Sequence, residues 1–96
     1  MANALVSVQI IPKTSNGEDT IPLVDAAIAV IEASGVKYQV NPLETTMEGE
    51  LTQLFSVIEK MNQKMVELGS ISVISQVKVY YKPDGASMDV LTEKYR

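Results

Sequence analysis

The residues best suited to chemistry lie in one stretch of the chain, from Tyr38 to Glu50. Within it, an asparagine amide, two threonine hydroxyls and a glutamate carboxylate follow one another closely. These groups belong to Asn41, Thr45, Thr46 and Glu48. Together they can donate and accept hydrogen bonds and can balance a positive charge. The stretch therefore predicts a recognition site for a small polar molecule.

Several residue types on which enzymes rely are missing. The chain contains no histidine and no cysteine, and its single arginine is the last residue, Arg96. Histidine is the commonest general base, and both residues are frequent zinc ligands. Without them, catalysis would rest on carboxylates, Lys13 or tyrosine, and these show no paired arrangement. We therefore predict a binding protein that is not an enzyme, with no catalytic residue, no cofactor and no metal site.

Length and charge limit the class of protein further. A chain of 96 residues fits one domain, which we expect to span residues 1–96. The net charge is −4 with scattered acidic residues, which disfavours nucleic-acid binding because phosphate contacts need clustered lysine and arginine. No segment approaches the roughly 20 apolar residues of a membrane span, and none reads as a signal peptide. The sequence predicts a cytoplasmic protein without nucleic-acid or membrane partners.

Hydrophobic periodicity predicts the order of secondary-structure elements. A period of two marks strands at residues 4–11, 36–41, 44–48 and 72–81. Helical spacing marks helices at residues 21–34 and 51–68, and Ser87 can cap a short C-terminal helix through Lys94. Pro12 is expected to end the first strand, and residues 13–19 form a loop by composition. The order β-α-β-β-α-β predicts an α+β, ferredoxin-like fold, with two helices on one face of a four-stranded antiparallel sheet.

The second face of this predicted sheet, opposite the two long helices, has no helix left to cover it. The handedness of crossover connections places the first and third strands in the centre. Strand alternation then gives the second face apolar residues at its ends and polar side chains in its middle. The polar ones are Ser7, Gln9, Gln39, Thr46, Glu48, Gln76 and Lys78. Such a surface suits solvent or a partner sheet, and we expect a homodimer or homotetramer.

The predicted fold hosts many functions, and missing residues exclude several of them. An acylphosphatase needs an arginine in the loop after the first strand, and a metallochaperone needs a cysteine pair there. An RNA-recognition module needs aromatic residues on the central strands. None of these is present. An oligomeric regulatory module of the ACT type, which binds a small metabolite largely through its backbone, remains an alternative.

Four segments resemble one known family. Residues 6–12, 36–42, 45–50 and 88–96 look like the thiamine-binding proteins, formerly grouped as a domain of unknown function and related to the YkoF thiamine/hydroxymethylpyrimidine-binding proteins. The resemblance covers nearly the whole chain, and the run Thr-Thr-Met-Glu-Gly-Glu at 45–50 is its most specific part. It implies a ferredoxin-like fold, assembly as dimers or tetramers, and binding of thiamine or its hydroxymethylpyrimidine half as carrier, buffer or sensor.

The chemistry of that ligand can be matched to the residues. An aminopyrimidine presents an amine donor beside ring-nitrogen acceptors, which Glu48 with Thr45 or Thr46 could satisfy. The cationic thiazolium could be balanced by a carboxylate, Glu44 or Glu48, or by the face of a tyrosine. Strand alternation puts Thr45 and Thr46 on opposite faces, so both can touch one ligand only if the strand is bulged or the ligand sits at its edge. The predicted ligand-binding residues are Ser7, Gln9, Tyr38, Asn41, Thr45, Thr46 and Glu48.

Structural roles compete with these assignments. Thr45 and Thr46 are good strand formers, Tyr38 could belong to the core, and the polar residues of the second face could be solvated or pair between subunits. Glu50 is assigned to the start of the second helix rather than to a ligand. Ser75 falls on the apolar face, where its hydroxyl must find a partner, either within the core or in a pocket.

Overall fold

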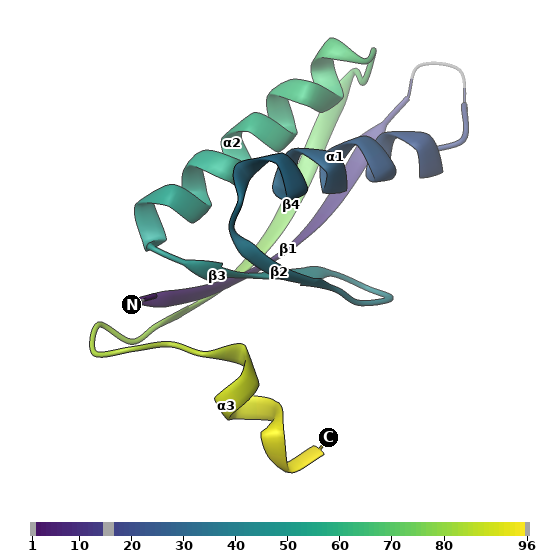
Figure 1. Cartoon of the computed structure of the whole chain (residues 1–96). Coiled ribbons are helices and arrows are strands. Elements are labelled where there is room, and N and C mark those ends of the chain that lie inside the picture. Colours follow the sequence, from purple (N-terminus) through teal and green to yellow (C-terminus); the bar gives the residue numbers. More distant parts are fainter. Residues whose placement is uncertain (1, 15–16, 96) are drawn as a thin grey trace.

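The computed structural model describes residues 2–14 and 17–95, so Ser15 and Asn16 of the predicted loop, together with Met1 and Arg96, lie outside the described residues. The elements are β1 (Ala4–Lys13), α1 (Ile21–Ser34), β2 (Lys37–Val40), β3 (Thr45–Gly49), α2 (Leu51–Glu67), β4 (Ser72–Tyr81), α3 (Met88–Thr92) and the 3-10 turn η1 (Glu93–Tyr95). Their order confirms the predicted one. Figure 1 shows α1 and α2 on the same side of the sheet.

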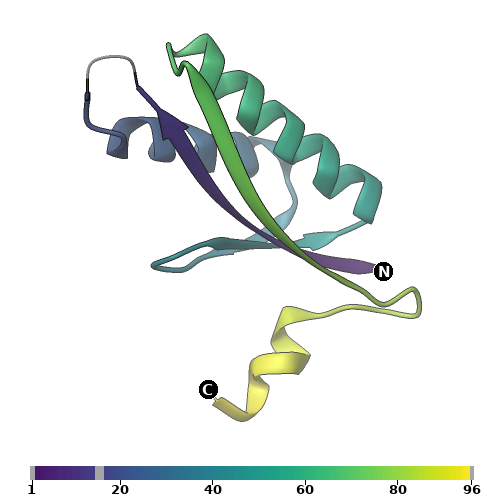
Figure 2. The ribbon, with the colours of Figure 1, turned by 180° about the vertical axis from the view of Figure 1, so that it is seen from behind.

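The sheet has the order β2-β3-β1-β4, and all its neighbours are antiparallel. The predicted ferredoxin-like fold, with β1 and β3 in the centre, is therefore confirmed. β1 pairs with β4 along its whole length, from Ala4 to Lys13, but with β3 only from Ala4 to Val8. The second half of β1 thus continues with β4 as a two-stranded ribbon beyond β2 and β3 (Figure 2).

The prediction that Pro12 ends the first strand is wrong, because β1 continues through Pro12 to Lys13. The carbonyl of Lys13 accepts a hydrogen bond from the Ile71 N–H at 2.8 Å, on the side of β4. Since neighbouring residues of a strand alternate, the nitrogen of Pro12 faces the opposite side, where β3 has already ended. No backbone donor is needed there, so proline is tolerated.

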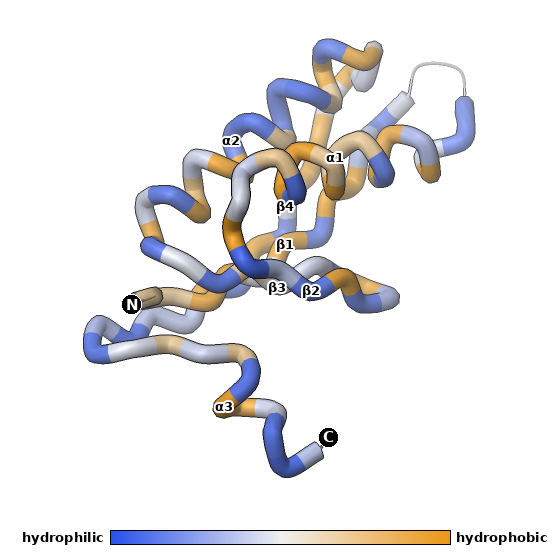
Figure 3. The backbone as a smooth tube through the Cα atoms, in the orientation of Figure 1, coloured by the Kyte–Doolittle hydropathy of each residue, from blue (hydrophilic) through white to orange (hydrophobic). Residues whose placement is uncertain are grey.

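The core lies between the two long helices and the sheet. Its largest fully buried side chains are Ile31, Met47, Leu54, Met61, Met65 and Val6. Figure 3 shows the matching hydrophobic segments along β1 and on both helices. On α2, Phe55 is 46% exposed, whereas Val57 is 3% exposed. α2 packs against α1 as well as the sheet, and burial is shifted toward the flank that carries Val57.

Ser75 is partly buried, and its hydroxyl has a hydrogen-bond partner. Its hydroxyl donates to Asn62 Oδ1 of α2 at 2.9 Å, and Asn62 Nδ2 in turn donates to the Ile58 carbonyl at 2.8 Å. Such a partner offsets the loss of water around the partly buried hydroxyl. The link ties β4 to α2, and the alternative of a pocket at Ser75 is not needed.

The expectation that no helix covers the second face is wrong at one end of the sheet. The C-terminal segment turns back beneath it (Figure 1), and Leu5, Ala86 and Met88 form a small buried cluster. As predicted, Ser87 caps the short helix, because its hydroxyl accepts from the Val90 N–H at 3.3 Å. In the described part of the chain, no helix has the length and apolar character needed to cross a membrane.

Candidate functional site

The hairpin between β2 and β3 ends in a tight turn at residues 41–44. The N–H of Asn41 donates to the carbonyl of Glu44 at 3.0 Å, with Pro42 and Leu43 between them. This hydrogen bond holds the ends of the turn together. The hairpin therefore presents the Asn41 amide and the Glu44 carboxylate at the same end of the sheet.

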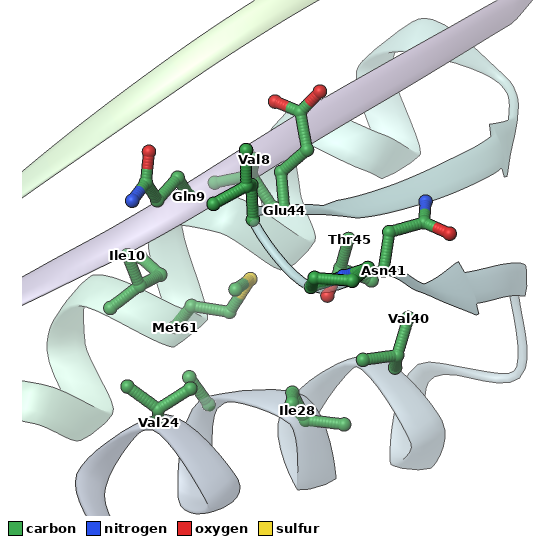
Figure 4. A pocket seen from close by; sticks show the side chains of 13 residues that line it. Val8, Gln9, Ile10, Val24, Ile28, Val40, Asn41, Glu44, Thr45 and Met61 are labelled. Carbon is green, nitrogen blue, oxygen red and sulfur yellow. The ribbon is translucent and has the colours of Figure 1, made fainter. Parts of the chain in front are cut away.

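A cavity of about 340 Å³, here called the hairpin cavity, lies between this hairpin, α1 and β1. It exists because β3 stops pairing with β1 at Val8, which leaves space beside the second half of β1. The residues that line it are Val8, Gln9, Ile10, Val24, Ala27, Ile28, Val40, Asn41, Pro42, Leu43, Glu44, Thr45 and Met61. Figure 4 shows Val24 and Ile28 of α1 across from Ile10 and Met61.

The interior of the hairpin cavity is apolar, and its polar groups come from the hairpin and from β1. Thr45 is 7% exposed and shares the helix-covered face with its partner Val8. Within the described part of the chain its hydroxyl makes no hydrogen bond. Val40 also lines the cavity and is half exposed. The arrangement suits a flat molecule with apolar faces and a polar edge.

Among the residues that line the hairpin cavity, Glu44 is the one with a charged side chain. Its Oε1 lies 3.1 Å from Lys78 Nζ of β4, and Figure 4 shows the carboxylate directed away from Met61 and Ile28. The Ser7 hydroxyl, followed by Lys78, lowers the pKa of Glu44 below its ordinary value of 4.5. The Ser7 oxygen is buried without a well-aligned hydrogen bond to any described residue. The Ser7 hydroxyl therefore lies near the Glu44 carboxylate without the geometry of a hydrogen bond. It stabilises the ionised carboxylate electrostatically.

A second cavity of about 300 Å³, here called the α3 cavity, lies on the opposite side of the sheet. Its lining residues are Leu5, Gln39, Asn41, Thr46, Met88, Leu91 and Thr92. Gln39 Nε2 donates to Asn41 Oδ1 at 3.2 Å on its wall. The α3 cavity contains no charged side chain among these residues, which distinguishes it from the hairpin cavity.

The seven predicted ligand-binding residues are divided between the two faces of the sheet. Tyr38 and Thr45 lie on the helix-covered face, where Tyr38 packs against the core. Ser7, Gln9, Thr46 and Glu48 lie on the second face, and Asn41 lies in the turn and lines both cavities. The register of β3 with β1 is continuous, with Thr45 opposite Val8 and Thr46 opposite Ser7. No bulge brings the two threonines together.

Glu48 has a structural contact. Its Oε1 accepts a hydrogen bond from the Met88 N–H at 2.8 Å, at the start of α3. Lys37, its partner in the sheet register, pairs with Asp89 of the same helix. These contacts fasten α3 to the sheet. The carboxylate that the sequence favoured for a ligand is thus already engaged.

The structure adds residues that the sequence did not single out as a site. The apolar lining from α1 and α2 has only the periodicity of core residues, so nothing in the sequence marks it as a cavity. Glu44 was considered only as a counter-charge, yet it lies at the cavity rim. Within residues 2–14 and 17–95, no group of acidic side chains is arranged to hold a metal ion.

Comparison with known proteins identifies the family. The sequence model of the family described as "Thiamine-binding protein" matches residues 6–96. The fold is that of a small ferredoxin-like protein, and the chain belongs to the thiamine-binding protein family. The predicted resemblance is therefore confirmed.

Individual relatives agree with this assignment. UPF0045 protein CPE1503 of Clostridium perfringens is 42% identical over 91 residues, 95% of each chain. A solved domain of unknown function, DUF77, from Bacillus cereus is 37% identical, with a TM-score of 0.91 over 100% of this chain and 93% of its own. A candidate thiamine biosynthesis/salvage protein of Thermotoga maritima is 26% identical, with a TM-score of 0.86 over 98% of this chain and 99% of its own.

Proposed function

We propose that the chain binds thiamine or its hydroxymethylpyrimidine half, without catalysing a reaction, as a cytoplasmic carrier, buffer or sensor. We place the ligand in the hairpin cavity. The observation that carries this proposal is an apolar cavity with a carboxylate at its rim and, on its wall, a threonine hydroxyl that makes no hydrogen bond to the described residues. The family and the Thermotoga maritima relative supply the class of ligand.

The pyrimidine half matches the interior of the cavity. Its flat faces would lie between the α1 side chains Val24 and Ile28 and the β1 side chain Ile10. Its amine and ring nitrogens would meet the Thr45 hydroxyl and the Asn41 amide, which can both donate and accept. The volume of about 340 Å³ lies at the lower end of the roughly 300 to 1,000 Å³ that is typical of ligand sites.

The thiazolium half matches the rim. The Glu44 carboxylate is ionised in the neutral range, as an ordinary glutamate is, and its lowered pKa keeps it so. An ionised carboxylate beside an apolar cavity can balance a cation that is partly removed from water. This favours intact thiamine over its neutral pyrimidine alcohol.

Substitution of the two adjacent threonines, one in each cavity, tests where the ligand binds. Thr45→Val removes the hydroxyl from the hairpin cavity with little change of shape, and Thr46→Val makes the same change in the α3 cavity. By calorimetric titration with thiamine and with hydroxymethylpyrimidine, we expect Thr45→Val to weaken both about tenfold, the effect of one lost hydrogen bond of about 1.4 kcal/mol. Thr46→Val should leave both unchanged. The reverse result would move the site to the α3 cavity, and no binding of either ligand at millimolar concentration would refute the function.

We also propose a homodimer or homotetramer, formed through β4. This edge strand of ten residues exposes Val77, Val79 and Tyr81 on one face and Ile74 and Tyr80 on the other. A long apolar edge with unpaired backbone groups favours pairing with a second copy. Sedimentation equilibrium should give a dimer or tetramer, and Val79→Lys should shift it toward the monomer. A wild-type monomer at high concentration would contradict the proposal.

A further inference from the structure

We infer that Lys78 determines the preference of the site for ligand charge, because it competes with a cationic ligand for the Glu44 carboxylate. This inference rests on the proposed function and deepens it. Lys78 lies on β4, outside the lining of the hairpin cavity. It would act only through the carboxylate that it contacts.

The Glu44–Lys78 contact crosses the central strand. In the sheet register Lys78 lies opposite Ser7 of β1, and its Nζ reaches over that strand to Glu44 Oε1 at 3.1 Å. The Ser7 hydroxyl beneath adds to the electrostatic stabilisation of the carboxylate. Both partners draw the carboxylate out of the hairpin cavity, in the direction that Figure 4 shows.

Glu44 borders two spaces. Besides the hairpin cavity, it lines a wider depression of about 510 Å³ formed with Gln9, Leu43, Gln76, Val77 and Lys78. Gln9 and Leu43 also line both spaces. A rotamer change of the Glu44 side chain would therefore carry its charge from the depression to the mouth of the hairpin cavity. In the structure the carboxylate occupies the outer of these two positions.

Lys78 is suited to be displaced. Its side chain is 78% exposed, whereas that of Glu44 is 29% exposed. An exposed ammonium is well hydrated when released, and its ion pair is weak. A cation held against the apolar cavity is less hydrated and gains more from the same carboxylate. Binding of a cationic ligand would thus release Lys78 into water, while a neutral ligand would leave the ion pair in place.

The test compares two lysine-to-methionine variants with two ligands. Lys78→Met keeps the length of the side chain and removes its charge. Lys82→Met is the matched control, because Lys82 also forms an exposed ion pair, with Asp84 at 3.0 Å. This variant removes the same positive charge from the protein. Calorimetric titration of wild type and both variants would use thiamine as the cation and hydroxymethylpyrimidine as the neutral probe.

Lys78→Met should tighten thiamine by up to about fivefold, the upper limit of what an exposed ion pair contributes, and should leave hydroxymethylpyrimidine unchanged. Lys82→Met should change neither. Equal tightening of both ligands, no change for thiamine, or the same response in Lys82→Met would overturn the inference while the proposed function stands. If the wild type binds neither ligand, the function and the inference fail together.

Discussion

Thr45 and Thr46 are consecutive residues of β3 that lie on opposite faces of the sheet, one opposite Val8 and the other opposite Ser7. Because the Thr45 hydroxyl has no hydrogen bond within the described residues, Thr45→Val should not lower the free energy of unfolding, and a small increase is expected from the added apolar burial. Urea unfolding measures this. A loss above about 1 kcal/mol would show that the hydroxyl has a structural partner.

The pKa of Glu44 should lie below its ordinary value of 4.5, because the Ser7 hydroxyl and Lys78 stabilise the ionised carboxylate. The depressed pKa contributes stability that is fully present above pH 4.5 and is lost as the pH falls through the lowered value. Thiamine binding should follow the same curve. Carbon-13 NMR of the side-chain carboxyl groups would measure the pKa, and a value at or above 4.5 would contradict the proposed electrostatics.

Ser7 and Lys78 should contribute unequally to this shift. The Ser7 hydroxyl is the larger cause and the Lys78 ion pair the smaller one. Ser7→Ala should therefore raise the pKa of Glu44 more than Lys78→Met does. The same NMR titration compares the variants, and the opposite order would show that the near contact with Ser7 is unimportant.

Glu48 should matter for α3 rather than for the ligand. Glu48→Ala removes the acceptor of the Met88 N–H and should cost about 1 to 2 kcal/mol of unfolding free energy. Amide hydrogen exchange should become faster in α3, whereas the affinity for thiamine should be unchanged. Glu50→Ala is the control, because the Glu50 side chain makes no capping hydrogen bond at the start of α2. A large loss of affinity in Glu48→Ala would return Glu48 to the site.

Ser75, which is partly buried, and Ser70, which is buried, should respond differently to removal of their hydroxyls. Ser75→Ala leaves Asn62 Oδ1 without its donor and should cost about 1 kcal/mol. Ser70→Ala removes a buried hydroxyl that has no partner among the described residues and should be neutral or stabilising. Urea unfolding of the two variants measures the difference, and equal costs would mean that the Ser75–Asn62 link contributes nothing.

The strands and helices were predictable because their patterns are long and regular. Alternation over Ser72–Tyr81 gave the bounds of β4, and the Ser87 cap located the start of α3. The position of α3 beneath the sheet was not predictable, since so short a helix has no informative periodicity. The prediction at Pro12 was wrong because a proline interrupts a strand only where its nitrogen faces a paired neighbour. Whether it does so in β1 depends on where β3 ends.

The sequence pointed to the hairpin that borders a cavity, but it did not show which side chains line that cavity. The hairpin around Asn41 and Thr45 does border a cavity, as the polar run suggested. Alternation also separated Thr45 from Thr46 correctly. The engagement of Glu48 with α3 depends on a chain reversal forty residues later, which no local pattern encodes. The ion pair of Glu44 is with Lys78, a residue on a different strand, and no local pattern predicts it.

The unequal pairing of β1 has a consequence for how the chain is made. The first strand finds its full-length partner only in β4, which is among the last elements to be synthesised. Until then the second half of β1, with its apolar side chains, has no strand beside it. Folding must therefore wait for distant contacts, which slows it and leaves this segment open to aggregation. A nascent chain that ends before Ser72 should need protection by a chaperone, although it already contains every residue of the hairpin cavity.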